Sequence, residues 1–306
     1  MIRFLLARLL WAAAAMVAAS GLVFALVHLV PADPVAAYAG PQADAETRDR
    51  IRRELGLDDP LAEQYARYLG RLARGDWGRS FVTGEGVAEA IRVRLPATAA
   101  VGFGALVFGF LVGTGIGVVT ARHRGTPIDR GVFLLATAAI SIPVFCLARL
   151  LQYTLAYRAD CFPVAGLAGW RHLLLPCLAL GIPTAGYYAR LVHASMIEVL
   201  SQDYIRAARA KGLPERVVLF KHALRNALLP VVTVLGMDVA GFLGGVVFIE
   251  STFALPGLGS LGLTAVLNLD VPMITGTVLF ATLVVILTNL AVDLLYPVID
   301  PRVRIR

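Results

Sequence analysis

Six runs of mostly apolar residues, each about 20 residues long, have the length that a helix needs to cross a bilayer. They occupy residues 9–30, 96–121, 132–156, 172–193, 228–248 and 274–296. Hydrophobic residues make up 58% of the 306 positions, and the mean hydropathy of +0.73 is far above that of an ordinary soluble domain. Because backbone polar groups in lipid must be paired within the segment, we expect an all-α, polytopic membrane protein with six transmembrane helices.

The first run has features of both a secretory signal and a membrane span. Arg3 and Arg8 precede it, and Ala19 and Ser20 are small enough to fit a cleavage site. However, the run stays apolar through Leu29, which is longer than the apolar core of a signal peptide. We therefore expect residues 1–30 to form an uncleaved transmembrane helix.

Basic residues predict the orientation of the six spans. They gather in the short segments 3–8, 122–130, 204–225 and 302–306, whereas the connection 250–273 contains no Lys or Arg. Positively charged short segments favour the cytoplasmic side. Both termini are therefore expected in the cytoplasm.

The apolar runs and the distribution of charge divide the chain into four parts. The expected parts are a first transmembrane helix (1–30), an extracytoplasmic helical segment (31–94), a core of five transmembrane helices (95–300) that includes a cytoplasmic helical loop between the fourth and fifth spans (200–230), and a cytoplasmic tail (301–306).

The sequence has no motif of a soluble-type active site. Its two lysines, Lys211 and Lys221, lie outside any GxxxxGK[ST] loop, so the chain binds no nucleotide by that route. The five histidines are scattered, and Cys146, Cys161 and Cys177 form no CxxC or related spacing. We therefore expect no catalytic residue, no metal site, no cofactor and no nucleic-acid partner. Gly109, Gly113 and Gly117 form GxxxG steps, which indicate close helix packing.

Residues 204–230 are basic and mildly amphipathic, and they lie between two apolar runs. Arginines and lysine alone would fit a solvated connector. A solvated connector does not explain the small residues Ala207 and Ala208, Gly212 or the apolar group 217–220. Gly212 would permit a turn, and Pro214 suits the first turn of a second helix. A helix, turn and helix that docks on another protein is the competing interpretation.

Two further groups of residues are candidates for the transport path or its outer end. Asp238 is in the fifth run, and because Gly241 and Gly245 follow at i+3 and i+7, the carboxylate shares a face with small residues. Charged residues inside spans usually face protein or water, so this face either lines a path or packs against a neighbouring helix. After the same run stand Glu250, Pro256, Gly257 and Gly259, which bend the chain at the mouth of a pathway or form an ordinary tight turn.

Short sequence blocks give the chain a family resemblance. Arg206, Ala207 and Ala208, followed by Gly212, resemble the EAA loop of ATP-binding-cassette importer permeases. Arg206 replaces the usual glutamate and Arg225 the usual proline, as in the dipeptide, oligopeptide and nickel permeases. Further blocks similar to that family are 55–69, 75–81, 94–98, 250–262 and 289–304.

The resemblance implies partners and residue roles. Residues expected to seat in a groove of a cytoplasmic ATPase are Arg206, Ala207, Ala208, Lys211, Gly212, Leu213, Pro214, Val217 and Phe220. The expected assembly is a bacterial inner-membrane importer with a second similar permease, two ATPase subunits that carry ATP and Mg, and one extracytoplasmic substrate-binding protein. Glu250, Pro256, Gly257 and Gly259 would form an outer gate or a binding-protein contact.

The substrate and the energy source each have alternatives. Peptides are the expected cargo, and glutathione-like molecules, nickel or a metal chelate are the alternatives within the same family. In a different class, an ion-coupled secondary transporter would use Asp238, Glu250 and Asp293 as coupling carboxylates, but the spans have no evident inverted repeat. A channel or scaffold would leave the loop unexplained.

Overall fold

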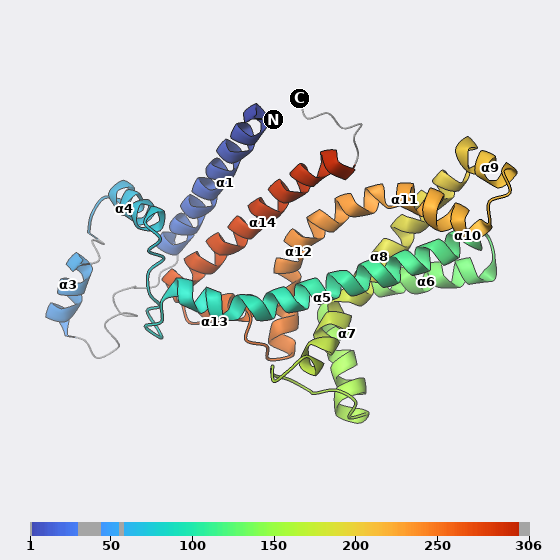
Figure 1. Cartoon of the computed structure of the whole chain (residues 1–306). Coiled ribbons are helices and arrows are strands. Elements are labelled where there is room, and N and C mark those ends of the chain that lie inside the picture. The colour runs from blue at the N-terminus through green and yellow to red at the C-terminus, as the bar shows by residue number, and fades with distance from the viewer. Residues whose placement is uncertain (1, 30–43, 55–57, 300–306) are drawn as a thin grey trace. The chain divides into compact units, whose positions relative to one another are not determined.

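The computed structural model describes residues 2–29, 44–54 and 58–299. Within these ranges all regular structure is helical, apart from one bridge between Arg79 and Gly86 (Figure 1). The α-helices are α1 (Ile2–Leu29), α3 (Ala45–Glu54), α4 (Leu61–Ala73), α5 (Val87–Arg122), α6 (Pro127–Ser141), α7 (Val144–Leu151), α8 (Arg171–Leu200), α9 (Asp203–Ala210), α10 (Glu215–Val217), α11 (Leu224–Ala227), α12 (Leu229–Thr252), α13 (Leu258–Leu267) and α14 (Val271–Ile299), and the π-helical segments are η1 (Gln152–Arg158) and η2 (Val218–Ala223).

The helices group into two compact units. One contains Met1–Pro96 with Gly257–Ile286, and the other Ala97–Pro256 with Leu287–Arg306. The boundary at Pro96 lies close to the predicted division between 94 and 95. Residues 257–286, which the sequence analysis placed in the five-helix core, group instead with the N-terminal part of the chain.

In the second unit, α5, α6 and α8 run side by side, and α9 and α10 lie at one end of them (Figure 1). Close approach of α5 to α8 depends on glycine. A Cβ on Gly113 would lie 2.6 Å from the carbonyl oxygen of Ala185, and one on Gly117 would lie 2.8 Å from that of Ala189. The GxxxG steps therefore bring two helices together, as the sequence predicted.

The third apolar run is not one straight helix. α6 ends at Ser141, and α7 begins after Pro143 at an angle of 101°. Ile142 has extended backbone angles, because a residue before proline is pushed out of the helical region. η1 then continues α7 to Arg158. The single span predicted at 132–156 is thus a sharply bent pair of helical segments.

In the first unit, the predicted extracytoplasmic segment is partly helical. α4 contacts α1 through Tyr65, whose hydroxyl donates to the carbonyl oxygen of Val17 at 3.0 Å and is 2.8 Å from the Ser20 hydroxyl. Asp270, buried just before α14, accepts hydrogen bonds from the Ser80 hydroxyl and from the Phe81 amide. Residues 30–43, 55–57 and the predicted tail 301–306 lie outside the described residues.

Among the described residues, two helices are long and apolar enough to cross a membrane, 87–122 and 271–291, and up to five segments qualify if each sharply bent pair counts as one span. Within α1 the apolar stretch is shorter, at 10–25. The helical membrane-type architecture is therefore confirmed, whereas the count of six spans stays a prediction.

Candidate functional site

The segment predicted to dock on another protein folds as a helix, a turn and a second helical stretch. α9 begins with Asp203, whose negative charge suits a helix N-terminus. The chain turns at Gly212, where φ is +75°, a conformation that residues with a Cβ rarely adopt. Pro214 then precedes α10 as its N-cap, one position before the first helical residue. The predicted turn at Gly212 is therefore present.

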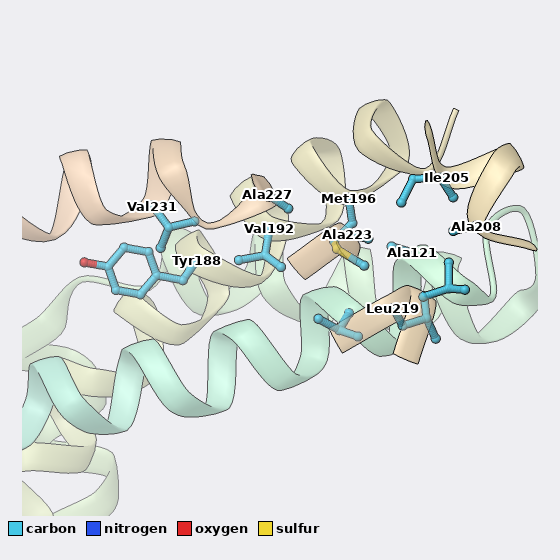
Figure 2. Close-up of a cluster of buried hydrophobic side chains, with 12 residues drawn as sticks. Ala121, Tyr188, Val192, Met196, Ile205, Ala208, Leu219, Ala223, Ala227 and Val231 are labelled. Atoms are coloured by element: carbon cyan, nitrogen blue, oxygen red, sulfur yellow. The ribbon is translucent and has the colours of Figure 1, made fainter. Parts of the chain in front are cut away.

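One side of this segment is buried against the helix bundle. Ile205 and Ala208, spaced three residues apart on α9, are 0% and 7% exposed. They belong to a set of buried side chains that we call the loop cluster, and Figure 2 shows the labelled members along one strip from Tyr188 and Val231 to Ile205 and Ala208. The loop cluster consists of Val118, Ala121, Tyr188, Val192, Met196, Ile205, Ala208, Val218, Leu219, Ala223, Ala227 and Val231.

The other side of the segment is exposed and mixes basic, small and apolar groups. Leu213 is 36% exposed and Phe220 is 59% exposed. Large exposed apolar side chains beside basic groups are typical of a surface that another protein covers. We call this surface the docking face, and it consists of Arg206, Ala207, Lys211, Gly212, Leu213, Pro214 and Phe220.

Burial corrects two details of the predicted docking set. Ala208 points into the loop cluster rather than outward. Val217, also in the predicted set, is half-buried, and Phe220 is exposed. Val218 and Leu219 between them, which the prediction did not include, are buried. The physical reason is that η2 must bury one apolar face against α5 and α8 to remain on the bundle.

Two polar contacts hold the turn. Arg209 donates to both carboxylate oxygens of Glu215, at 3.2 and 2.8 Å, across Gly212. Asn226 donates to the Tyr204 hydroxyl at 2.7 Å, which joins α11 to α9. The hydrogen bond from Arg209 lowers the pKa of Glu215 below its usual range. The docking face is thus fixed by an ion pair at its turn and by apolar burial beneath it.

We expect the ion pair to make a small, pH-dependent contribution to the order of the turn. A lowered folded pKa means that the contribution is present above the ordinary carboxyl pKa of 4.5 and is lost as the pH falls through the lowered value. Both side chains are partly exposed, so Glu215→Gln should cost about 0.5 kcal/mol at pH 7. Hydrogen exchange of α9, corrected for intrinsic rates, should show a larger difference between the variant and the parent at pH 7 than at pH 3. A difference of the same size at both pH values would contradict the assignment.

The candidate path residue Asp238 lies on α12 and is half-buried. Its carboxylate accepts a hydrogen bond of 2.5 Å from the hydroxyl of Tyr188, whose side chain on α8 is 0% exposed. Gly241, one turn further along α12, is exposed and would have nothing within 4 Å of an added Cβ. The surroundings of Gly245 lie outside the described residues. Gly241 is thus exposed, whereas the half-buried Asp238 is held by Tyr188 of α8.

Glu250 does not lie on a surface. Its side chain is 0% exposed, and its Oε1 accepts a hydrogen bond of 2.5 Å from Thr98 on α5. Direct contact with a binding protein through Glu250 is therefore wrong for this structure, and a gate that includes Glu250 stays a prediction. In the other unit, the Gly257 amide is bonded to the Ser260 hydroxyl at the start of α13, and Gly259 is half-buried. Pro256 is exposed.

Three structurally important residues were not singled out from the sequence as site residues. Tyr188 positions the carboxylate of Asp238, and Ile205 and Leu219 anchor the docking segment. The i, i+3 spacing of Ile205 and Ala208 was a usable signal for a buried face. No comparable local signal connects Tyr188 to a residue 50 positions away. Among the described residues, no group of three or more His, Cys, Asp or Glu could hold a metal ion.

Two family models match consecutive parts of the chain. The model for the inner membrane component of binding-protein-dependent transport systems matches residues 113–305. The model for the N-terminal part of such membrane components matches residues 1–102.

Relatives are similar over nearly the whole chain. The glutathione transport system permease protein GsiC of Salmonella paratyphi A is 40% identical over 99% of both chains, and that of Escherichia coli is 39% identical over the same shares. Among solved structures, an inward-facing MetNI methionine ABC transporter aligns with a TM-score of 0.58 and 22% identity, over 69% of this chain and 96% of that chain. An amino acid ABC transporter aligns with a TM-score of 0.52 and 16% identity, over 71% and 95%. These two structures support the fold alone.

Proposed function

Because the chain belongs to the family of inner membrane components of binding-protein-dependent transport systems, we propose that it forms half of the transmembrane pathway through which an ATP-driven importer moves a peptide-type substrate. The chain is a permease subunit and not an enzyme. The observation that carries the proposal is the docking face, an exposed surface held by buried side chains on the same helices that would line the pathway.

The substrate proposal rests on the relatives. The permeases of Salmonella and Escherichia coli with about 40% identity are parts of glutathione transport systems, and glutathione is a small peptide. This supports di- or oligopeptides, or glutathione-like molecules, as cargo. Nickel or a metal chelate is the alternative cargo, and no group of three or more His, Cys, Asp or Glu in the described residues adds support for a free metal ion.

The proposed assembly contains a second similar permease, two ATPase subunits with ATP and Mg, and one extracytoplasmic binding protein. ATP binding would close the two ATPases, and the docking face would carry that movement into α5, α8 and α12, which share the loop cluster. The pathway would then open outward to receive substrate, and hydrolysis would return it to the inward-open state.

The proposed topology has six spans, formed by α1, α5, α6 with α7 and η1, α8, α12 and α14. Both termini and the docking face lie in the cytoplasm, and the chain resides in a bacterial inner membrane. The distribution of arginine and lysine supports this orientation.

A cysteine crosslink tests the proposed docking. In a background lacking Cys146, Cys161 and Cys177, Leu213→Cys should crosslink to the ATPase of the purified complex, because Leu213 is on the docking face. Ala208→Cys is the matched control, since it lies in the same segment but is buried. Absence of any ATPase crosslink from Leu213→Cys in an active complex would overturn the proposal, as would equal crosslinking from Ala208→Cys.

Asp238 is proposed to contact a positively charged group of the substrate, such as a peptide amine. In the purified complex with saturating binding protein, Asp238→Asn should lower uptake of a peptide with a free amino terminus about tenfold, the effect of losing one hydrogen bond to a charged group. Uptake of the same peptide with an acetylated amino terminus should change little.

Tyr188→Phe provides a second variant for this proposal, because it removes the hydrogen bond that positions the carboxylate and keeps the charge. It should shift the preference between the two peptides in the same direction by a smaller factor. Unchanged uptake of both peptides in a stably folded Asp238→Asn protein would remove Asp238 from the pathway.

A further inference from the structure

The end of the third apolar run carries arginine where the proposed topology disfavours it. Arg158 and Arg171 flank the loop 159–170, and Arg149 lies two turns before Arg158. In the proposed orientation this loop is extracytoplasmic, the side on which short loops are poor in Arg and Lys. The arginines therefore need a local reason to be there.

Two of these arginines donate hydrogen bonds to neutral groups, and the third lies near an aromatic ring. Arg149 donates to the side-chain oxygen of Gln152 at 2.9 Å, and Arg171 donates to the carbonyl oxygen of Cys161 at 2.9 Å. The guanidinium of Arg158 lies 5.8 Å from the ring centroid of Tyr153. None of the three forms an ion pair with a carboxylate in the described part of the chain. Each arginine thus has a neutral contact and no carboxylate partner among the described residues.

Gln152 connects this region to the rest of the unit. Its side chain is 8% exposed, and its amide donates to the carbonyl oxygens of Val164, at 2.8 Å, and Thr252, at 3.2 Å. The loop is thereby held against the start of η1 and the end of α12. Arg149, bonded to Gln152, and Arg171, bonded to Cys161, thus both border the same loop.

Exposed aromatic and apolar side chains accompany the arginines. Tyr153 and Tyr157 stack with ring centroids 5.9 Å apart, and Trp170 is 70% exposed. Further back along α7, Phe145 and Leu150 are 50% and 54% exposed. Along α7 and η1 the exposed side chains therefore pass from apolar residues to tyrosine and then to Arg158, and Trp170 precedes Arg171 at the other end of the loop. This order matches the acyl chain, interface and headgroup of a phospholipid.

We propose that this surface binds the phosphate of an anionic phospholipid in the outer leaflet, with the acyl chain along α7. We call the surface the lipid strip, and it consists of Phe145, Leu150, Tyr153, Tyr157, Arg158, Trp170 and Arg171. Charge complementarity selects the headgroup: the one carboxylate of the loop, Asp160, forms no ion pair with Arg158 or Arg171 among the described residues, so a phosphate would supply the partner for these two charges. The inference rests on the proposed function for the outer placement of the loop.

Lipid retention by the complete transporter tests the proposal. The purified complex is placed in nanodiscs of phosphatidylcholine with a minor fraction of phosphatidylglycerol, and the lipids that stay bound are measured by native mass spectrometry. Arg158→Gln with Arg171→Gln should lower retained phosphatidylglycerol about fivefold for each arginine removed. Arg71→Gln with Arg74→Gln is the matched control, because it removes two exposed arginines at the end of α4.

Several outcomes would overturn the lipid proposal. Equal phosphatidylglycerol retention in the parent and in the Arg158/Arg171 variant would do so, as would an equal loss in the Arg71/Arg74 control. Displacement of the lipid by soluble glycerol phosphate would assign the site to a free anion. A raised KM for substrates with extra carboxylates, with lipid retention unchanged, would assign the arginines to the substrate.

Labelling of the native Cys161 distinguishes a failure of the lipid proposal from a failure of the proposed topology, because Cys161 is exposed within the same loop. With Cys146 and Cys177 replaced by alanine, a membrane-impermeant maleimide should label Cys161 from outside intact cells. Labelling only from the cytoplasmic side would overturn the proposed topology and, with it, the outer leaflet as the source of lipid. Labelling from outside with unchanged lipid retention would overturn the lipid proposal alone.

Discussion

Replacing Gly113 by valine is expected to remove most of the folded permease from the membrane. An added Cβ would lie 2.6 Å from the carbonyl oxygen of Ala185 and 2.7 Å from the Cβ of Tyr188. Backbone atoms cannot move aside as a flexible side chain can, so α5 and α8 must separate. Overpacking of this kind costs about 1–3 kcal/mol or more. The amount of chain extracted in monodisperse form and its thermal unfolding temperature measure the effect.

Gly115 is the matched control for Gly113. It lies on the same helix two residues away, and an added Cβ there would meet nothing within 4 Å. Gly115→Ala should therefore leave the extracted amount unchanged, or raise stability by up to about 1 kcal/mol because alanine favours the helix. Equal loss from Gly113→Val and Gly115→Val would show that helix propensity, rather than contact with α8, explains the result.

Replacing Gly212 by valine is expected to lower both substrate-dependent ATP hydrolysis and transport. The residue adopts φ of +75° between α9 and α10, which costs a β-branched side chain about 1–3 kcal/mol. The strain is relieved if the turn changes shape, which moves Leu213 and Lys211 away from their positions on the docking face. We expect substrate-dependent ATP hydrolysis and uptake in proteoliposomes to fall at least tenfold, a loss that corresponds to about 1.4 kcal/mol.

Gly125 supplies a control with the same backbone strain. It adopts φ of +79° in the turn between α5 and α6, and an added Cβ would also meet open space there. Gly125→Val should therefore cost similar stability without a comparable loss of uptake. If both variants lose uptake equally, general destabilisation explains the effect and the special role of the turn at Gly212 is rejected.

Local sequence was sufficient to predict the helix, turn and helix of the docking segment, but not which of its residues are buried and which are exposed. Gly212 and Pro214 marked a turn followed by a second helix, and the structure has both. Which residues of that segment are buried depends on side chains from α5 and α8, far away in the sequence. For this reason the buried Ala208 could not be distinguished from the exposed Ala207 by residue type alone.

Long-range contacts explain the other differences. Thr98 and Glu250 are 152 positions apart, and nothing near Glu250 in the sequence indicates that its carboxylate is enclosed. The bend at Ile142 did have a local signal in Pro143, but an uninterrupted apolar run outweighed it. Apolar runs predict how much chain is suited to lipid, whereas a change of direction depends on backbone angles at one or two residues.

The loop cluster connects the docking segment to the candidate pathway through continuous side-chain packing. Tyr188 lies at one end of the cluster and donates its hydroxyl proton to the hydrogen bond with Asp238, while Ile205 and Ala208 lie at the other end (Figure 2). Tightly packed side chains are hardly compressible, so a push on α9 is passed on as displacement rather than absorbed as local deformation. The movement of the ATPase subunits would then determine when the Asp238 carboxylate is exposed to the substrate. The timing of substrate contact would depend on the ATPase cycle rather than on the cargo.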